Sequence, residues 1–232
     1  MTVARLWFDH VPPGPRHDPA VSAGSVILAI STRTLRGVEP SRGTRRREDT
    51  PPEFRAAVES LCAVQLRPEV ILEQTSAPKR VAPYAYAMTA DMEDEGASGR
   101  LVLLHDPGGQ QAWHGQYRLV TFVRAELEPE IAADPMVLTV GWSWLTEAFE
   151  DRRAAQTAAS GTVTRVSSES FGGMAGRPAT AEVEIRASWT PLDADLGPHM
   201  LAFSDVLTTA AGLLPLPAGV VPMPTQRGAR RR

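Results

Sequence analysis

The stretch DPMVLTVGWSWLTEAFEDR, residues 134–152, is the part of the sequence around which we expect the fold to be organised. Pro135 stands where a helix can begin, because proline is tolerated in a first helical turn. In a helix, the apolar residues of this stretch fall into two rows at spacings of three and four. The rows are Val137, Val140, Trp144 and Ala148, and Leu138, Trp142, Leu145 and Phe149. Two rows are more than one sheet face covers, so the helix is either sandwiched inside the domain or presents one row to a partner.

Upstream of this stretch, the spacing predicts a first helix over residues 50–65. Thr50 and Glu53 have the spacing of a capping box, in which the two side chains accept hydrogen bonds from free amides at the helix start. Apolar residues then recur at helical spacing, and Pro68 stops the helix. These apolar residues are Phe54, Ala57, Val58, Leu61 and Val64.

The apolar period then changes from helical to alternating, which predicts four strands over residues 69–74, 81–90, 100–106 and 116–127. Residues 106–109 read Asp-Pro-Gly-Gly, a strong turn signal, because proline sets one turn angle and glycine supplies positive φ. Short connections of this kind join antiparallel neighbours, since parallel strands need a long crossover.

Downstream of the central stretch, residues 161–171 and 180–190 alternate as two further strands around a glycine-rich turn, and residues 198–211 have the pattern of a last helix. The expected order is helix, four strands, helix, two strands, helix. We therefore predict a single α+β domain, mainly an antiparallel sheet of five to six strands with three helices. This order resembles the secretion-chaperone-like fold, which mostly holds partner proteins, although the chain has one strand more.

Charge divides the chain into three parts. Residues 1–50 hold eight arginines against five acidic residues, and residues 213–232 hold four arginines and no acidic residue. Residues 51–212 hold twelve basic against 22 acidic residues. We expect a poorly ordered basic extension, an acidic domain and an extended proline-rich segment with an arginine-rich tail. An acidic domain repels a phosphate backbone, so the basic tails are the parts suited to contact nucleic acid.

Several classes of protein are disfavoured by the composition. No apolar run is long enough to span a bilayer, and the first ten residues lack the order of a secretory signal. The single cysteine, Cys62, excludes an intramolecular disulfide and a multi-thiolate zinc site, which fits a reducing compartment. Because motifs for a nucleophile, a phosphate loop or a metal site are also missing, we expect a cytoplasmic protein without a metal or cofactor.

Two groups of polar residues are candidates for a site. Strand alternation suggests a charged ladder on the sheet face opposite the core, where arginines fixed by carboxylates hold an anion in two-pronged geometry. The ligand-binding candidates are Arg124, Arg165, Arg186, Glu126, Glu184 and His105. The alternative is an ordinary solvated sheet face. The adjacent His105 and Asp106 are metal ligands in some phosphohydrolases, but the pair is also typical of a strand end where the aspartate shapes a turn.

Several stretches identify a family resemblance. They are FRAAVESLCAVQLRPEVILE, LVLLHDPGGQQAW, TFVRAELEPEIAADP, GWSWLTEA, SGTVTRVSSESFGGM, AEVEIRASWTP and LPAGVVPMP, within residues 52–224. Their wording is similar to that of an actinobacterial family catalogued as domain of unknown function 3000 (DUF3000). The resemblance implies no activity, cofactor or catalytic residue. Relatives are often encoded beside a ribonuclease-D-like gene, which is a hint of RNA processing.

Three hypotheses about function follow. The first is a non-enzymatic adaptor or regulatory module that binds a protein partner or itself through the central helix, at Val140, Trp142, Trp144, Leu145 and Phe149. The second is a hydrolase or a small anionic-ligand-binding domain that uses the charged ladder. The third is an accessory protein of RNA processing that contacts RNA through its basic tails.

Overall fold

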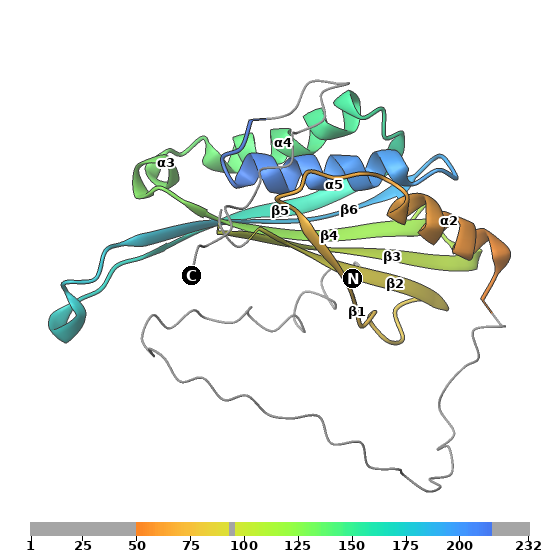
Figure 1. The fold of residues 1–232 in the computed structure, drawn as a ribbon, viewed down its shortest axis with the longest axis horizontal. Helices are drawn as coiled ribbons and strands as arrows, with labels where there is room; N and C mark the ends of the chain where they lie inside the picture. Colours follow the sequence, from red (N-terminus) through yellow and green to blue (C-terminus); the bar gives the residue numbers. More distant parts are fainter. Residues whose placement is uncertain (1–49, 93–95, 215–232) are drawn as a thin grey trace, which may run out of the picture. The chain divides into compact units, whose positions relative to one another are not determined.

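The computed structural model describes residues 50–92 and 96–214. Apart from residues 50, 213 and 214, the predicted basic extension and the predicted proline-rich segment with its arginine-rich tail lie outside these residues. Figure 1 shows the elements in chain order. They are α2 (Pro52–Cys62), β1 (Ile71–Thr75), β2 (Tyr84–Met92), β3 (Ala97–Gln110), β4 (Gly115–Leu127), α3 (Pro129–Ala133), α4 (Val137–Asp151), β5 (Gln156–Ser168), η3 (Gly172–Met174), β6 (Thr180–Pro191) and α5 (Gly197–Ala210). The predicted α+β class and element order are confirmed, with the short helix α3 as an addition.

The six strands form one antiparallel sheet in the order β1-β2-β3-β4-β6-β5. Hairpins join the first four strands, because their connections are short. The last two strands are out of sequence order in the sheet: β6 pairs with β4, and β5 pairs with β6 at the outer edge. After β4 the chain runs through α3 and α4, forms the edge strand β5, and then returns as β6 between β5 and β4.

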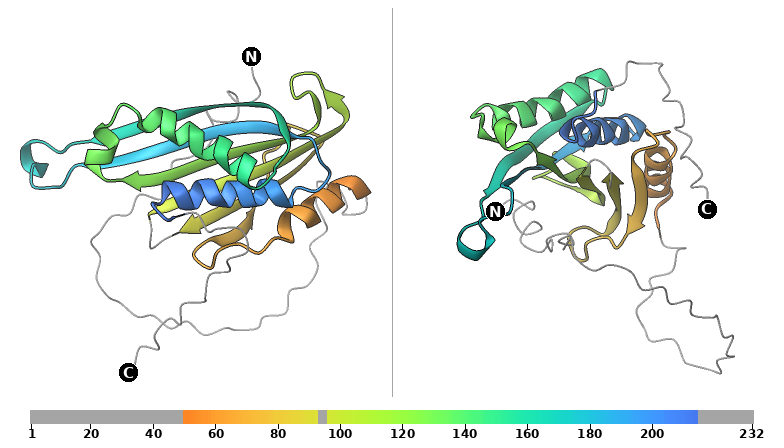
Figure 2. Two further views of the ribbon diagram at one scale, coloured as in Figure 1. Left: turned by 90° about the horizontal axis from the view of Figure 1, so that it is seen from above. Right: turned by 60° about the vertical axis from the view of Figure 1, so that its left-hand side comes forward.

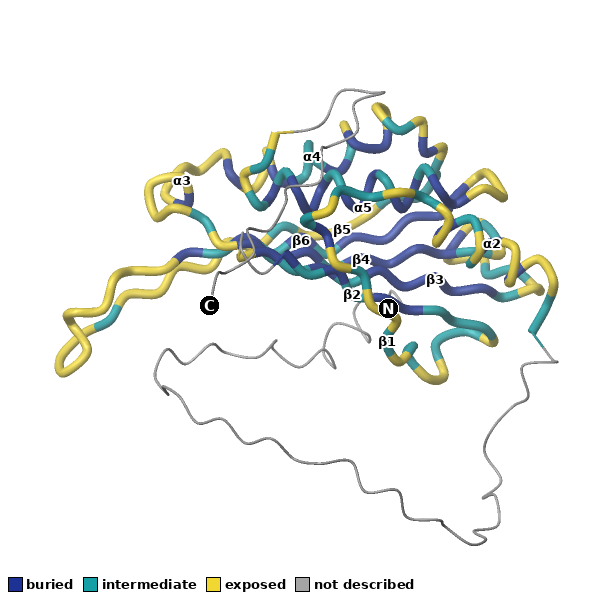
Figure 3. The backbone as a smooth tube through the Cα atoms, in the orientation of Figure 1, coloured by how far each residue is buried: buried dark blue, intermediate teal, exposed yellow. Residues whose placement is uncertain are grey.

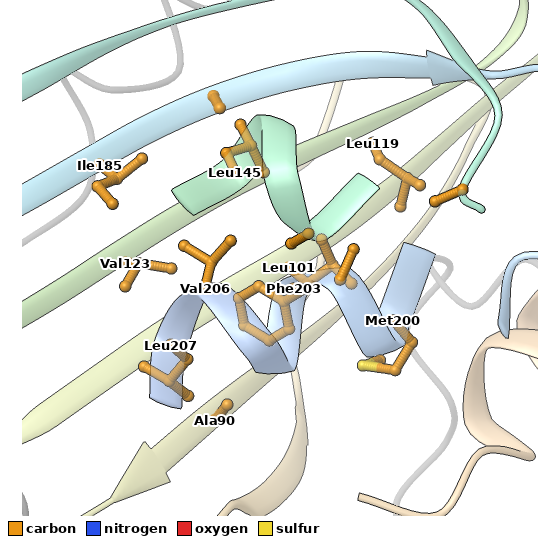
Figure 4. Close-up of a cluster of buried hydrophobic side chains, with 14 of the residues drawn as sticks. Ala90, Leu101, Leu119, Val123, Leu145, Ile185, Met200, Phe203, Val206 and Leu207 are labelled. Atoms are coloured by element: carbon orange, nitrogen blue, oxygen red, sulfur yellow. The ribbon is translucent and has the colours of Figure 1, made fainter. Parts of the chain in front are cut away.

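The core lies between the sheet and the helices on one of its faces (Figure 2). Side chains from α2, α4 and α5 belong to one hydrophobic cluster with alternate residues of the strands. Figure 4 shows Phe203 and Val206 of α5 beside sheet residues such as Leu101 and Val123. Leu145 brings α4 into the same cluster. The helices bury the strands' alternate apolar residues, which is the expected arrangement for a half-covered antiparallel sheet.

The opposite sheet face carries the alternate set of residues, and no helix of the described residues packs on it. We call it the helix-free face. Val102, Leu104 and Val120 lie here and are buried. The residues next to them along the sheet are polar and charged, including Arg118, Arg124 and the side chains of β6 that face the same way. This face therefore joins an aliphatic region to a polar one.

The predicted capping box is wrong. Helix α2 begins with Pro51 as its N-cap, one residue later than expected, and no side chain caps it. The Glu53 carboxylate instead lies 3.8 Å from Nε2 of His105.

The central helix is also shorter than predicted, because Pro135 precedes it and the Asp134 carboxylate accepts the amide hydrogen of Met136 at 2.8 Å.

The predicted turn at residues 106–109 is a bulge within β3. The Asp106 carboxylate accepts the Gly108 amide hydrogen at 3.0 Å, and Gly109 takes a φ of +71°. Pairing resumes between Gln110 and Gly115, so the chain reverses only at residues 111–114. Within this tip, Trp113 is buried and its carbonyl accepts a hydrogen bond from the Thr190 hydroxyl. The turn chemistry was recognised correctly, but attachment of the tip to β6 moves the reversal further along the chain.

Candidate functional site

Arg124 and Arg186, two arginines of the predicted ladder, lie on the helix-free face and are each bound to a glutamate. Nε of Arg124 donates to Oε2 of Glu182 at 2.8 Å, and its Nη2 donates to the other carboxylate oxygen. Nη2 of Arg186 donates to Glu184 at 2.7 Å. The Glu182 hydrogen bond, together with the charges of Glu182, Glu184 and Glu126, raises the pKa of Arg124 above its ordinary value. Both cations already have carboxylate partners: the Arg124–Glu182 pair joins β4 to β6, whereas Arg186 and Glu184 both lie on β6.

Two ladder candidates, Arg165 and His105, lie elsewhere. Arg165 pairs in register with Val183 and therefore points to the helix-covered face. Its Nη1 donates to the Ala132 carbonyl at 2.5 Å, which fastens α3 to β5. His105 pairs with Tyr117 near the other end of β4 and also faces the helices. Strand register therefore places Arg165 and His105 on the helix-covered face, apart from the four other ligand-binding candidates.

His105 is completely buried in an aromatic cluster under α2. Its ring stacks on Tyr117 with centroids 4.3 Å apart and on Phe54 at 5.7 Å, and Tyr84 lies at 5.9 Å. Burial, followed by the charge of Glu53, raises the pKa of Tyr117. Asp106 points into the bulge instead, and the described residues contain no group of three His, Cys, Asp or Glu side chains placed to hold a metal ion. The surroundings of His105 give it a packing role.

Arg118 has the most unusual environment on the helix-free face. Its Nη2 donates to the Ser188 hydroxyl at 2.8 Å and the Ser188 carbonyl at 3.1 Å. The same nitrogen lies 3.4 Å from the Ser160 hydroxyl, and Nη1 donates to the Thr190 hydroxyl at 3.1 Å. Only 6% of the residue is exposed, and burial lowers the pKa of its guanidinium. Among the described residues, no carboxylate forms an ion pair with it.

The partner-binding candidates on α4 differ in their exposure. Leu145 and Phe149 are buried in the core, and Trp142 and Trp144 are half-buried against it. Val140 is 39% exposed. Both predicted apolar rows are therefore covered only in part, because Leu138 in one row is 42% exposed and Val140 in the other is also exposed. Leu145 and Phe149 are not available to a partner on the surface of the described fold, because both side chains are already enclosed.

Two of the exposed apolar side chains that sequence reasoning missed lie at the tip of the β5–β6 hairpin. Phe171 is 72% exposed and Met174 is 51% exposed, on either side of two glycines in a short 3₁₀ turn. Figure 3 shows that the end of this hairpin is exposed where it extends beyond the helices, and the outer part of β5 is mostly exposed as well. The glycines were interpreted as hairpin chemistry alone. The signal was a phenylalanine and a methionine in a turn, where polar residues are the usual choice.

Comparisons with known proteins place the chain in a family. None of the helices in residues 50–92 and 96–214 has the length and apolar character that crossing a membrane requires. No curated protein and no solved structure matches the chain. A family model described as "Protein of unknown function (DUF3000)" matches residues 50–221, which include every described helix and strand. The chain therefore belongs to the DUF3000 family.

Proposed function

We propose that this chain is a non-enzymatic protein-binding module, an adaptor or regulator in the cytoplasm, and that the β5–β6 hairpin makes the contact with the partner or with a second copy of the chain. The element order supports this proposal by analogy, because it resembles that of the secretion-chaperone-like fold. The lone cysteine supports the reducing compartment. The site differs from the surface first predicted on α4, most of which is covered.

The exposure of Phe171 and Met174 is the observation that carries the proposal. Burial of a large apolar side chain contributes about 1.5–3 kcal/mol of favourable free energy, so burial of Phe171 and Met174 against a partner would favour association. A two-stranded ribbon buries little apolar surface of its own. The tip of the hairpin, residues 168–180, therefore adds little to the core of the domain, and its exposure is consistent with a contact surface.

The edge strand β5 provides a second element of the contact. Among the described strands it pairs only with β6, so one row of its backbone groups faces outward. Its outer part contains Thr162, Thr164 and Val166 and no proline, and its charged residue, Arg165, donates to the Ala132 carbonyl of α3. An extended segment of a partner can add to this edge by backbone hydrogen bonds, while Phe171 and Met174 bind an apolar surface beside it.

The test uses the double variant Phe171→Ser/Met174→Ser, with Leu192→Ser as the matched control. Leu192 is 62% exposed and follows the other end of β6, so this substitution removes a similar apolar side chain away from the hairpin tip. Light scattering would measure the oligomeric state, and pull-downs with each purified variant would compare bound proteins. We expect the wild type and the control to associate and the double variant to lose association.

The same experiment has an outcome that contradicts the proposal. Circular dichroism would first establish that all three proteins keep their secondary structure. If the wild type is a strict monomer and retains no protein that the double variant fails to retain, the hairpin is not a contact surface. Equal loss of association in the Leu192→Ser control would also contradict the proposal, because general surface hydrophobicity would then explain the association without a specific role for the hairpin.

A further inference from the structure

The buried cation Arg118 is held almost entirely by hydroxyl groups. Ser188, Thr190 and Ser160 surround its guanidinium at 2.8–3.4 Å, and the Ser188 carbonyl is the remaining acceptor. All these groups are neutral. The residue is more than nine-tenths buried, so its positive charge has lost most of its hydration without gaining a carboxylate among the described residues. A buried charge in this state is costly unless a counter-ion is supplied.

The neighbouring arginines show that the helix-free face provides carboxylates where it requires them. Arg124 is bound by Glu182, and Arg186 is bound by Glu184. Arg118 lies on the same strand and the same face as Arg124, yet its cross-strand neighbours on β6 are a serine and a threonine. Two arginines of this face have glutamate partners, whereas the third has only hydroxyl groups and a carbonyl, so an anion from outside would supply its missing counter-charge.

The hydroxyls have the chemistry to complete such a site. A serine hydroxyl has one donor hydrogen and two acceptor lone pairs, so it can accept from a guanidinium and still donate to an anion. The recorded bonds of Ser188 and Ser160 to Arg118 use their hydroxyl oxygens as acceptors, which leaves both hydrogens for a ligand. Thr190 donates its hydrogen to the Trp113 carbonyl and orients the cluster.

We propose that Arg118, Ser188 and Ser160 form a binding site for an oxyanion, the carboxylate or phosphate group of a small molecule. The guanidinium supplies the charge and the two serine hydroxyls supply directed donors. Ser160 is exposed at the edge strand β5, which provides an approach from solvent. Leu104, which pairs in register with Arg118, and Val120 on the same face are both buried, so Ser160 is the exposed member of the site through which an anion would enter.

This site goes beyond the proposed function and does not depend on it. The hairpin tip and the Arg118 cluster are built from different residues, and a protein without a partner at the hairpin could still bind an oxyanion here. The proposal also differs from the ladder predicted from sequence, because Arg124 and Arg186 already have carboxylate partners.

Thermal unfolding of the purified full-length chain tests the site. Tm would be measured against increasing sodium phosphate, and separately sodium acetate, with sodium chloride added to keep the ionic strength constant. The phosphate and acetate series distinguish the two sources of the oxyanion. We expect a saturable rise in Tm of about 3 °C or more in at least one series, because a ligand that binds only the folded state stabilises it.

Two variants connect the shift to Arg118. Arg118→Met preserves much of the side-chain volume and removes the charge, and it should abolish the rise in Tm. Arg124→Gln is the matched control on the same face, and it should keep the rise because Arg124 already has a carboxylate partner. An equal rise in Arg118→Met would overturn the proposal, since it would show that phosphate or acetate acts on the protein generally.

A third variant keeps the test decisive if Arg118→Met does not fold. Ser160→Ala changes an exposed residue and removes one proposed donor. It should raise the half-saturating anion concentration about five-fold, the effect of one lost hydrogen bond. A half-saturating concentration that stays unchanged in Ser160→Ala, or a wild type that responds to neither anion beyond chloride, would overturn the site.

Discussion

His199 provides the sharpest prediction about stability, because the fold holds it neutral. It is completely buried in the first turn of α5, where its Nδ1 accepts the indole hydrogen of Trp189 at 3.2 Å. Its ring meets Phe149 edge-on. Burial lowers the pKa of His199 from its ordinary 6.5 to about 4, although the charges of Asp193 and Asp195 oppose this shift. The folded state therefore favours the neutral imidazole.

The pKa difference determines a loss of stability on acidification. The unfolded chain takes up a proton at His199 near pH 6.5, whereas the folded chain does so only near pH 4. Acidification through this window therefore favours the unfolded state. Each pH unit between the two values corresponds to about 1.4 kcal/mol. From about pH 7 to about pH 5, the free energy of unfolding should fall by about 2 kcal/mol on account of His199 alone.

The assay is urea denaturation at both pH values, with His199→Asn as the comparison. The asparagine oxygen can accept the Trp189 indole hydrogen in place of Nδ1 but cannot be protonated in this range. The variant loses ring contacts and should be less stable at both pH values. The informative quantity is the change in the free energy of unfolding with pH, which should be about 2 kcal/mol smaller in the variant.

Comparison of the two proteins cancels contributions from other titrating groups, including carboxylates that begin to protonate near pH 5. If wild type and His199→Asn lose the same free energy between the two pH values, His199 is not held neutral by burial. The environment of the ring would then not disfavour the charged imidazolium, and the predicted loss of stability on acidification would have no basis.

Two further predictions concern packing. Gly161→Ala should lower the free energy of unfolding by about 3 kcal/mol or more, because a Cβ there would meet the β6 backbone and lie 2.8 Å from Cζ3 of Trp142; Gly173→Ala, with nothing within 4 Å of its Cβ, is the control in urea denaturation. Arg152 and Asp205 join α4 to α5 by two hydrogen bonds of 2.5 and 2.8 Å. A double-mutant cycle of the two alanine variants should give a coupling of about 1 kcal/mol, and a coupling near zero would contradict it.

Local sequence patterns were sufficient to predict most of the fold. Alternation located all six strands, and helical spacing located α2, α4 and α5, because both signals depend on residues within one or two turns of each other. Element ends were less predictable. Residues 106–109 form a bulge, and the chain reverses only at a tip that is hydrogen-bonded to Thr190, a residue far along the chain. A turn signal alone does not contain this information.

The candidate site was predictable only in part. Alternation placed Arg124, Glu126, Glu184 and Arg186 in the predicted ladder, and the structure brings these four residues to one face. It failed for Arg165, because alternation within β5 cannot show which of its two faces packs under the helices. It also could not show that Arg118 has serine and threonine neighbours while Arg124 has a glutamate. These neighbours are determined by register between β4 and β6.

The sequence by itself determined the α+β class, the order of the elements and the amphipathic character of the central helix, because each depends on short-range periodicity. The tertiary structure alone decided that β6 lies between β4 and β5, and that α5 and the sheet cover Leu145 and Phe149. It also decided that Arg118 is buried among hydroxyls while Phe171 is left in water. The physical reason is that burial and charge pairing depend on which distant segments pack together, and this is settled only when the whole sheet has formed.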